Sequence, residues 1–350
     1  MTFKTISAAL VAAALAFAAG ISAAQAEKLV ISNWDGYMPK DMAEKFKAAT
    51  GIDLEIAVHA TNEEIMGKVT ASGGEGFDVL FVSSPFAEAL NNLGLAAPID
   101  HSKVPNMANL YPEAMQLKHD PGNVFSVPYT WGTTGICYRS DLVKTEPASW
   151  NDLLKPADDL KGKVTMLSTD RWLMAAGFLA NGMSVNTTDQ ASLDKVRDQL
   201  VETKRALLAY DDTTFYSKLV SGEASMVHAW DGWCNYGIAE KPEIKYVIPK
   251  EGSDLWVDSI VVTKASKNPD AAHKFIDFVL NAENGKWVVE NIMYKSPNKA
   301  GMESIDKSML EKYPNMAIAP AELLKYEQLR DLGEGMKAFS RTVSEIMAAK

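Results

Sequence analysis

The sequence predicts an α/β protein of two lobes, in which each lobe contains a mostly parallel sheet flanked by helices. In the first third of the chain, three short runs rich in Val, Ile, Leu and Phe alternate with segments whose apolar residues have helical spacing. The apolar runs are residues 28–32, 54–58 and 77–82. The same alternation returns, less regularly, farther along the chain. Because a single hydrophobic core rarely serves more than about 250–300 residues, a chain of 350 residues is expected to divide in two.

The first predicted lobe places its loops around one crevice. Its first helix is expected to begin at Pro39 and to end before Gly51, and Thr61 or Asn62 is expected to cap its second helix. Strands joined by right-handed helical crossovers run parallel, so their carboxyl ends meet at one edge of the sheet, where ligands bind. The segments expected to line this crevice are residues 33–39, 59–63 and 83–86.

The middle of the chain predicts a second α/β unit. A helix is expected at residues 188–209, and another helix is expected to follow Asn268 as N-cap, with Pro269 in its first turn. No low-complexity linker separates the units, so the chain is expected to cross between lobes within ordinary strands. The segments expected to form strands are residues 163–167, 224–229, 244–248 and 258–263.

Residues 1–26 have the features of a secretory signal peptide. Lys4 precedes an alanine-rich apolar run at residues 6–21, and Ala24-Gln25-Ala26 has the small-x-small pattern of a cleavage site. We therefore expect removal after Ala26 and a mature chain that begins at Glu27. Polar residues interrupt and follow the apolar run, which makes a permanent membrane anchor the weaker alternative, and no cysteine follows the run to carry a lipid.

Composition disfavours several classes of protein. The formal charge is -10, and Lys and Arg are scattered along the chain, so we expect no nucleic-acid partner. The five histidines are dispersed, and no nucleophile elbow, phosphate-binding glycine loop or His-Glu-x-x-His motif is present. We therefore expect no enzyme, no metal and no cofactor. Cys137 and Cys234 either form one disulfide or remain two buried thiols.

Aromatic residues stand beside acids at three predicted strand ends. An aromatic face attracts an ammonium group, and a desolvated carboxylate binds it through a charge-assisted hydrogen bond, so the combination indicates recognition of an amine. The alternative is that each tryptophan anchors a core and each aspartate serves a turn. The three segments are Trp34-Asp35-Gly36-Tyr37, Trp230-Asp231-Gly232-Trp233 and Trp256-Val257-Asp258.

Several segments, in their order and spacing, resemble the periplasmic spermidine/putrescine-binding proteins of ABC importers. The resemblance implies a two-lobed periplasmic binding protein fold that closes over a small-molecule amine and delivers it to a membrane permease. It further implies a periplasmic monomer, with residues 27–135 and 257–303 in lobe 1 and residues 136–256 and 304–350 in lobe 2. The segments that carry the resemblance are Asn33-Trp34 with Tyr37, and residues 77–84, 128–134, 149–153, 256–259 and 294–298.

The resemblance also implies the binding residues. It places an aromatic and polar box around the ligand and gives the amine contact to Asp258. The box comprises Trp34, Tyr37, Ser83, Trp230, Trp256 and Tyr294. The chain departs from the family pattern at three other places. Asp35 stands one residue before the position of a family acid, and Phe86 stands beside the position of a family aromatic residue. Asp170 matches the first of two distal family acids, whereas Leu173 replaces the second. Ser84 and Asp231 complete the candidates as neighbours of these segments, and Gln328 lies near the position of a family glutamine.

Arg171 leaves the ligand class open. If Arg171 faces solvent, Asp258 and Asp170 each hold one end of a diamine such as putrescine or of a longer polyamine such as spermidine. If Arg171 faces the pocket, it binds a carboxylate, and the ligand is an ω-amino acid such as 4-aminobutyrate. Two alternatives from other classes are a hydrolase that uses Asp231 and Asp258 as acid and base, and a purely structural periplasmic protein.

Overall fold

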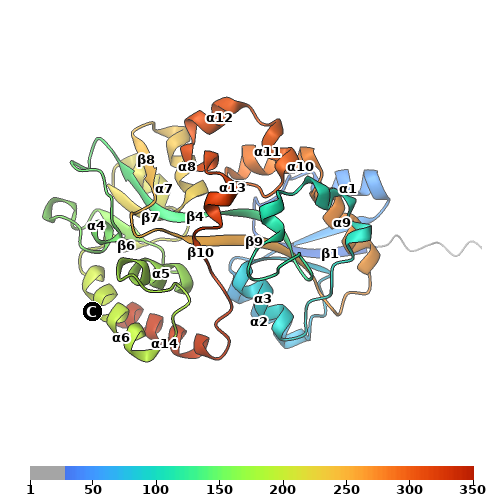
Figure 1. The fold of residues 1–350 in the computed structure, drawn as a ribbon, viewed down its shortest axis with the longest axis horizontal. Helices are drawn as coiled ribbons and strands as arrows, with labels where there is room; N and C mark the ends of the chain where they lie inside the picture. Colours follow the sequence, from blue (N-terminus) through green and yellow to red (C-terminus); the bar gives the residue numbers. More distant parts are fainter. Residues whose placement is uncertain (1–27) are drawn as a thin grey trace, which may run out of the picture.

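One mixed sheet runs through both halves of the molecule in a computed structural model that describes residues 28–350 (Figure 1). The strand order is β2-β1-β3-β9-β4-β7-β5-β6, with β10 beside β9 and β8 beside β4. The strands are β1 Lys28–Asn33, β2 Asp53–Val58, β3 Val79–Ser83, β4 Val127–Arg139, β5 Val164–Met166, β6 Ala209–Tyr210, β7 Met226–Trp230, β8 Ile244–Val247, β9 Asp254–Val262 and β10 Glu327–Gln328.

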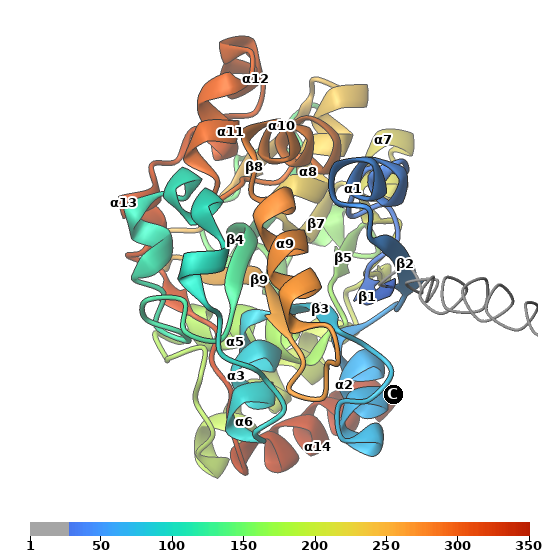
Figure 2. The same ribbon diagram turned by 90° about the vertical axis from the view of Figure 1, so that its right-hand side faces the viewer.

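Helices cover the sheet in both halves. The first half carries α1 Met42–Thr50, α2 Asn62–Ser72, α3 Ser84–Asn92 and α9 Pro269–Val279, and α9 lies across the face of β9 (Figure 2). The second half carries α4 Trp150–Leu154, α5 Asp170–Ala180, α6 Gln190–Lys204, α7 Phe215–Ser221, α8 Asp231–Glu240 and α14 Gly335–Ala348, and α14 lies along α6 (Figures 1 and 2). The remaining helices are α10 Ala282–Trp287, α11 Lys299–Ser304, α12 Lys307–Lys312 and α13 Pro320–Leu323.

Two long buried strands connect the halves. β4 pairs antiparallel with β9 from Val127 to Thr133, and then pairs with β7 from Thr134 to Tyr138, so this one strand belongs to both halves. β9 also pairs antiparallel with β3, while β1, β2 and β3 are parallel, as are β5, β6 and β7. The sheet therefore has the predicted parallel groups and, in addition, two antiparallel strands that connect the halves. β4 passes from the first half into the second and β9 returns beside it, so the two strands run in opposite directions.

The helix boundaries test the sequence signals. The first helix begins at Met42 rather than at Pro39, since residues 35–41 form turns, whereas Gly51 adopts φ 77° at its end as predicted. The hydroxyl of Thr61 accepts the backbone N–H of Glu64 and caps α2.

Two other element boundaries differ from the prediction, and one agrees with it. The helix predicted at residues 188–209 ends at Lys204 and is followed by β6, and β9 begins four residues earlier than the predicted strand start at residue 258. Asn268 precedes α9, and Pro269 occupies its first turn, as predicted.

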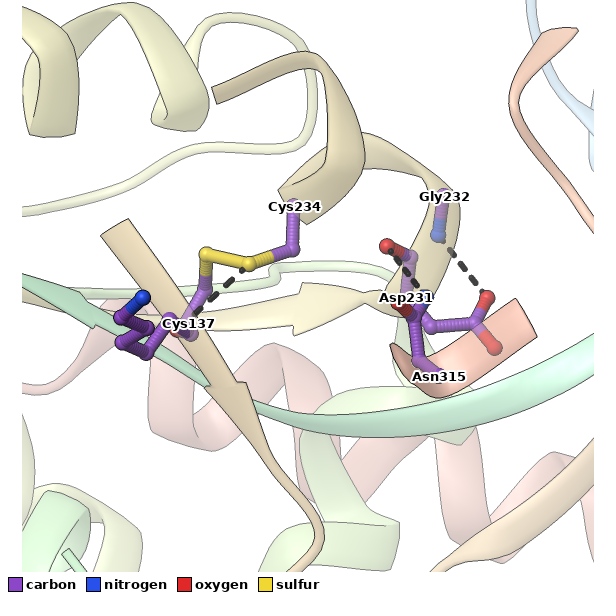
Figure 3. The surroundings of a disulfide bond; sticks show 6 residues. Cys137, Asp231, Gly232, Cys234 and Asn315 are labelled. Carbon is purple, nitrogen blue, oxygen red and sulfur yellow. Dashed lines mark hydrogen bonds between the residues drawn. A yellow bond between two sulfur atoms is a disulfide. The ribbon is translucent and has the colours of Figure 1, made fainter. Parts of the chain in front are cut away.

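A disulfide joins Cys137 of β4 to Cys234 of α8 across 97 residues of sequence (Figure 3). The sequence left open whether the two cysteines form a disulfide or remain thiols, and in the structure they form the disulfide. The bond ties the start of α8 to the central strand, and α8 forms part of the ligand cavity described below.

Residues 1–26, predicted as a signal peptide, lie outside the described residues. Within residues 28–350, no helix is both long enough and apolar enough to cross a membrane.

Candidate ligand-binding site

A cavity of about 610 Å³ lies between the two halves. The residues that follow β1, β2 and β3 line it from the first half, and those that follow β5, β6 and β7 line it from the second half. This is the carboxyl edge of both parallel groups, where ligands bind in open α/β sheets. The lining comprises Trp34, Asp35, Gly36, Tyr37, Ala60, Thr61, Asn62, Glu63, Ser83, Thr169, Trp172, Asp212, Thr213, Tyr216, Trp230, Trp233, Tyr236, Trp256, Asp258, Ile292 and Tyr294.

Asp258 forms the polar floor of the cavity. Its carboxylate accepts hydrogen bonds from the hydroxyls of Tyr37 at 2.6 Å, Ser83 at 2.7 Å and Thr130 at 3.2 Å. Burial raises the pKa of Asp258, and the three hydroxyl donors oppose that rise. Ser83 is itself fixed by Asn62, whose side chain accepts the Ser83 backbone N–H at 2.9 Å and donates to its hydroxyl at 3.1 Å. The carboxylate is therefore held in one orientation before any ligand arrives.

Aromatic rings make up most of the wall. The ring centroids of Trp256 and Tyr294 are 4.9 Å apart and those of Tyr37 and Tyr294 6.2 Å, both in edge-to-face contact. Trp172 and Trp230 make a similar contact at 5.4 Å in the opposite half. These faces can cover the methylene groups of a ligand and attract its cationic groups.

Two glycines allow the rings to pack against the backbone. A Cβ atom added at Gly232 would lie 1.7 Å from the ring of Tyr294, and one added at Gly132 would lie 2.4 Å from the ring of Trp256. Any side chain at either position would therefore push an aromatic ring out of the cavity wall.

The charge of the lining has one sign. Four carboxylates line the cavity, those of Asp35, Glu63, Asp212 and Asp258. Within residues 28–350, no Lys, Arg or His side chain contributes to this lining. Burial raises the pKa of Glu63, and the nearby charges of Asp170 and Asp212 raise it further. Because unscreened like charges repel across a low-dielectric gap, this arrangement favours a cationic ligand between them.

Eight of the thirteen candidate residues line this cavity. They come from both halves and from β9, so they meet only in the folded chain. These eight are Trp34, Asp35, Tyr37, Ser83, Trp230, Trp256, Asp258 and Tyr294.

Three of the other five candidates lie outside the wall for local reasons. The Ser84 hydroxyl donates to the carbonyl of Leu329, and Phe86 packs against the apolar core beside α2 and α3. Asp170 accepts a hydrogen bond from the hydroxyl of Ser340 at 2.8 Å, which ties it to α14.

Asp170, the predicted distal carboxylate, does not line the cavity, whereas two of its neighbours in the chain do. Thr169 and Trp172, which are three residues apart, line the cavity, whereas Leu173 is fully buried and Asp170 points to α14. A helix turns by about 100° per residue, so an error of one position moves a side chain to another face.

Arg171 faces neither solvent nor the cavity, which contradicts both alternatives for its orientation. Only 3% of its surface is exposed, and its guanidinium donates to the carbonyl of Arg330 at 2.5 Å and to the side chain of Asn186 at 2.7 Å. It also lies 5.5 Å from the ring centroid of Phe339. Its amphipathic side chain instead fastens the start of α5 to the segment that follows β10.

Asp231 is buried and does not line the cavity, whereas Asp258 does. Its carboxylate accepts the backbone N–H groups of Thr133 at 3.1 Å and Gly232 at 2.9 Å, and its surroundings are shown in Figure 3. Burial raises the pKa of Asp231 to about 7. The acid and base of the hydrolase alternative therefore do not meet at one surface. Within residues 28–350, no cluster of His, Cys, Asp and Glu could hold a metal ion.

The sequence reasoning missed most of the wall from the second half. Asp212, Thr213 and Tyr216 follow β6, a two-residue strand that begins at Ala209, the last residue of the helix predicted at residues 188–209. The one available signal was the polar turn Asp211-Asp212-Thr213 after an apolar stretch, which is typical of a strand end. Asp212 accepts hydrogen bonds from the backbone N–H of Ser168 at 2.8 Å and from the hydroxyl of Thr169 at 3.0 Å.

Comparisons with known proteins agree with this geometry. The family model of bacterial extracellular solute-binding proteins matches residues 41–317. The putrescine-binding periplasmic protein PotF of Escherichia coli is 30% identical over 88% of both chains, and spermidine/putrescine-binding periplasmic protein 1 of Haemophilus influenzae is 28% identical over 94% of this chain and 91% of its own. The solved structure of a putative spermidine/putrescine ABC transporter from Listeria monocytogenes is 31% identical, covers 93% of this chain and 100% of its own, and superposes with a TM-score of 0.84. These likenesses confirm the predicted two-lobed fold and the predicted resemblance: the chain belongs to the family of bacterial extracellular solute-binding proteins.

Proposed function

We propose that the protein captures a polyamine with at least two ammonium groups in the cavity between its halves. The single observation that carries the proposal is the chemistry of the lining, which has four carboxylates, nine aromatic rings and no cationic side chain among the described residues. The names of relatives that bind putrescine or spermidine agree with this ligand class.

Asp258 receives the first ammonium group. It is the most deeply buried carboxylate of the lining, and Trp256 and Tyr294 stand beside it to cover the adjoining methylene groups. A charged hydrogen bond in such a site is stronger than one in water because the surrounding dielectric is low.

Glu63 and Asp212 receive the second ammonium group in place of the predicted Asp170. They line the cavity from opposite halves, and the charge of Asp212, after that of Asp170, raises the pKa of Glu63. An ammonium group bound between the two carboxylates is attracted by both, and these attractions offset the repulsion between the carboxylates. Ligand charge is therefore linked to closure of the two halves.

The zwitterionic alternative, 4-aminobutyrate, lacks a partner for its carboxylate. Arg171 was the residue that would have bound that carboxylate, and it is directed to Asn186 and Arg330 instead. Placing a carboxylate among Glu63 and Asp212 without a counter-charge would be costly.

The proposed role includes export and delivery. Residues 1–26 serve as a signal peptide that is removed after Ala26, and the mature monomer acts in the periplasm. Residues 27–135 with 257–303 form lobe 1, and residues 136–256 with 304–350 form lobe 2. The closed, loaded form passes the amine unchanged to the permease of an ABC importer, without chemical conversion and without nucleic acid.

Titration calorimetry on the mature protein tests the proposal. Putrescine, spermidine, 4-aminobutyrate and 1-aminobutane form a matched panel, since 1-aminobutane is putrescine without its second ammonium group. We expect the two polyamines to bind at least tenfold more tightly than the other two ligands. Tight binding of 4-aminobutyrate with none of putrescine would instead support the zwitterionic alternative, and release of a product from any substrate would support the hydrolase.

A further inference from the structure

The row of side chains that forms the cavity floor continues beyond the cavity. Trp256 and Asp258 project from the same face of β9 and line the cavity. Side chains two residues apart in a strand share a face at a spacing of about 7 Å, so Asp254 extends the row on the other side of Trp256. Asp254 does not line the cavity, and only 1% of its surface is exposed.

Asp254 is a buried carboxylate without a hydrogen-bond partner. Neither of its oxygens has a donor in hydrogen-bonding geometry. Burial raises its pKa to about 6. The hydroxyl of Thr134, the charge of Arg171 and the indole of Trp172 oppose that rise, so the hydroxyl and the indole lie near the carboxylate although neither meets strict hydrogen-bonding geometry. A buried charge without a partner is costly, so native structures rarely keep one without a use.

The donors near Asp254 also lack acceptors. The indole N–H of Trp172 and the hydroxyl of Thr134 are both buried, and neither has a hydrogen-bond partner. Arg171 directs its two terminal nitrogens to Arg330 and Asn186, while its Nε–H is also buried without a partner. Of these three unpartnered donors, only the indole N–H of Trp172 belongs to a side chain that lines the cavity.

Trp172 is the neighbour of Asp254 that reaches the cavity. It lies in the first turn of α5, lines the cavity, and makes an edge-to-face contact with Trp230 at an interplanar angle of 85°. We propose that Asp254 is a positioning residue of the ligand cavity, whose carboxylate accepts the indole N–H of Trp172 and so sets how that ring faces the ligand.

The indole spectrum of the ligand-free protein tests this pairing directly. The chain has eight tryptophans, and the indole N–H signal of Trp172 can be assigned by its loss in Trp172→Phe. We expect Asp254→Asn, which keeps the volume and removes the charge, to shift the Trp172 signal more than any other indole signal. The exposed Asp270→Asn, which makes the same chemical change outside the cavity, should leave it unmoved. A constant Trp172 signal, or a larger shift at Trp256, would overturn the proposal.

A double-mutant cycle tests the consequence for binding, and this arm rests on the proposed polyamine function. We expect Asp254→Leu to weaken putrescine binding about tenfold in the wild type but less than about twofold in the Trp172→Phe background, because contacting residues are energetically coupled. Asp254→Asn retains an acceptor oxygen and should stay within about threefold of the wild type. Equal losses in both backgrounds would show that Asp254 does not act through Trp172.

The two arms separate the possible failures. If the wild type binds no putrescine, the proposed function fails, while the indole spectrum still decides the pairing. If Asp254→Leu does not fold, as judged by its thermal unfolding, Asp254→Asn and Trp172→Phe carry the spectral test on their own.

Discussion

Replacing Asp258 by Asn removes the charge that the proposed site presents to the first ammonium group. A carboxylate has about four positions at which its oxygens accept hydrogen bonds. Tyr37, Ser83 and Thr130 occupy three of them, so one position remains for a ligand. Because the three protein donors are hydroxyls that can also accept, the amide introduced by Asp258→Asn can be accommodated, and the fold is expected to survive.

The size of the effect follows from burial. A hydrogen bond to a charged group contributes about 1.5–3 kcal/mol, and the loss of one partner from a buried charge pair costs about 2–5 kcal/mol. Only 9% of Asp258 is exposed, so solvent replaces little of the lost interaction. We expect putrescine binding to weaken by about 2–4 kcal/mol, which is about 30-fold to 1,000-fold.

Titration calorimetry measures this loss, and Asp270→Asn is the matched control. Asp270 is an exposed partner of Lys103, so its replacement changes the net charge equally but leaves the cavity intact. Thermal unfolding without ligand verifies that both variants fold. An affinity of folded Asp258→Asn within about threefold of the parent, well under 1 kcal/mol, would refute the assignment of Asp258 to the site.

Four further measurements probe the same structure. Glu63→Gln should weaken putrescine binding by about 1–2 kcal/mol and leave 1-aminobutane within about twofold, as measured by calorimetry; equal losses for both would disprove a distal subsite. Replacing Cys137 and Cys234 together by Ala opens a loop of 97 residues and should lower the free energy of unfolding by about 2–5 kcal/mol in denaturant titrations; an unchanged midpoint would contradict a stabilising bridge. Burial raises the pKa of Asp231 to about 7 from an unfolded value of about 4, so its contribution to the free energy of unfolding is full below pH 4 and is lost as pH rises through 7. Asp231→Asn should therefore flatten the decline of that free energy between pH 5 and pH 7.5, and parallel profiles would exclude Asp231 as its source. Small-angle scattering should show a smaller radius of gyration at saturating putrescine, whereas an unchanged curve would argue against closure.

The sequence predicted well those features that depend on neighbouring residues. Thr61 caps α2, Gly51 ends α1 in a left-handed conformation, and Pro269 opens α9, because each signal acts within one turn of backbone. Trp34, Asp35 and Tyr37 after β1 and Trp230 at the end of β7 line the cavity as expected for the same reason, since a strand end is visible as a change in local pattern.

The errors arose where a side chain's direction depends on distant packing. Asp170 was expected in the cavity wall but instead accepts a hydrogen bond from Ser340 of α14, because sequence spacing does not give the rotation of α5. Asp212 was missed because β6 has two residues and exists only through its pairing with β5.

The amino-acid sequence was sufficient for the α/β class and for the position of the crevice at the strand ends, since apolar periodicity and turn chemistry are local properties of the chain. The resemblance to spermidine/putrescine-binding proteins pointed to Asp258, which the structure places in the cavity lining. The tertiary structure decided which acids line the cavity, that Arg171 does not line it, and that Asp254 lies near Trp172. These last relations join residues tens to hundreds of positions apart, and their free energies depend on burial and mutual distance, which arise only when the two halves pack around β4 and β9.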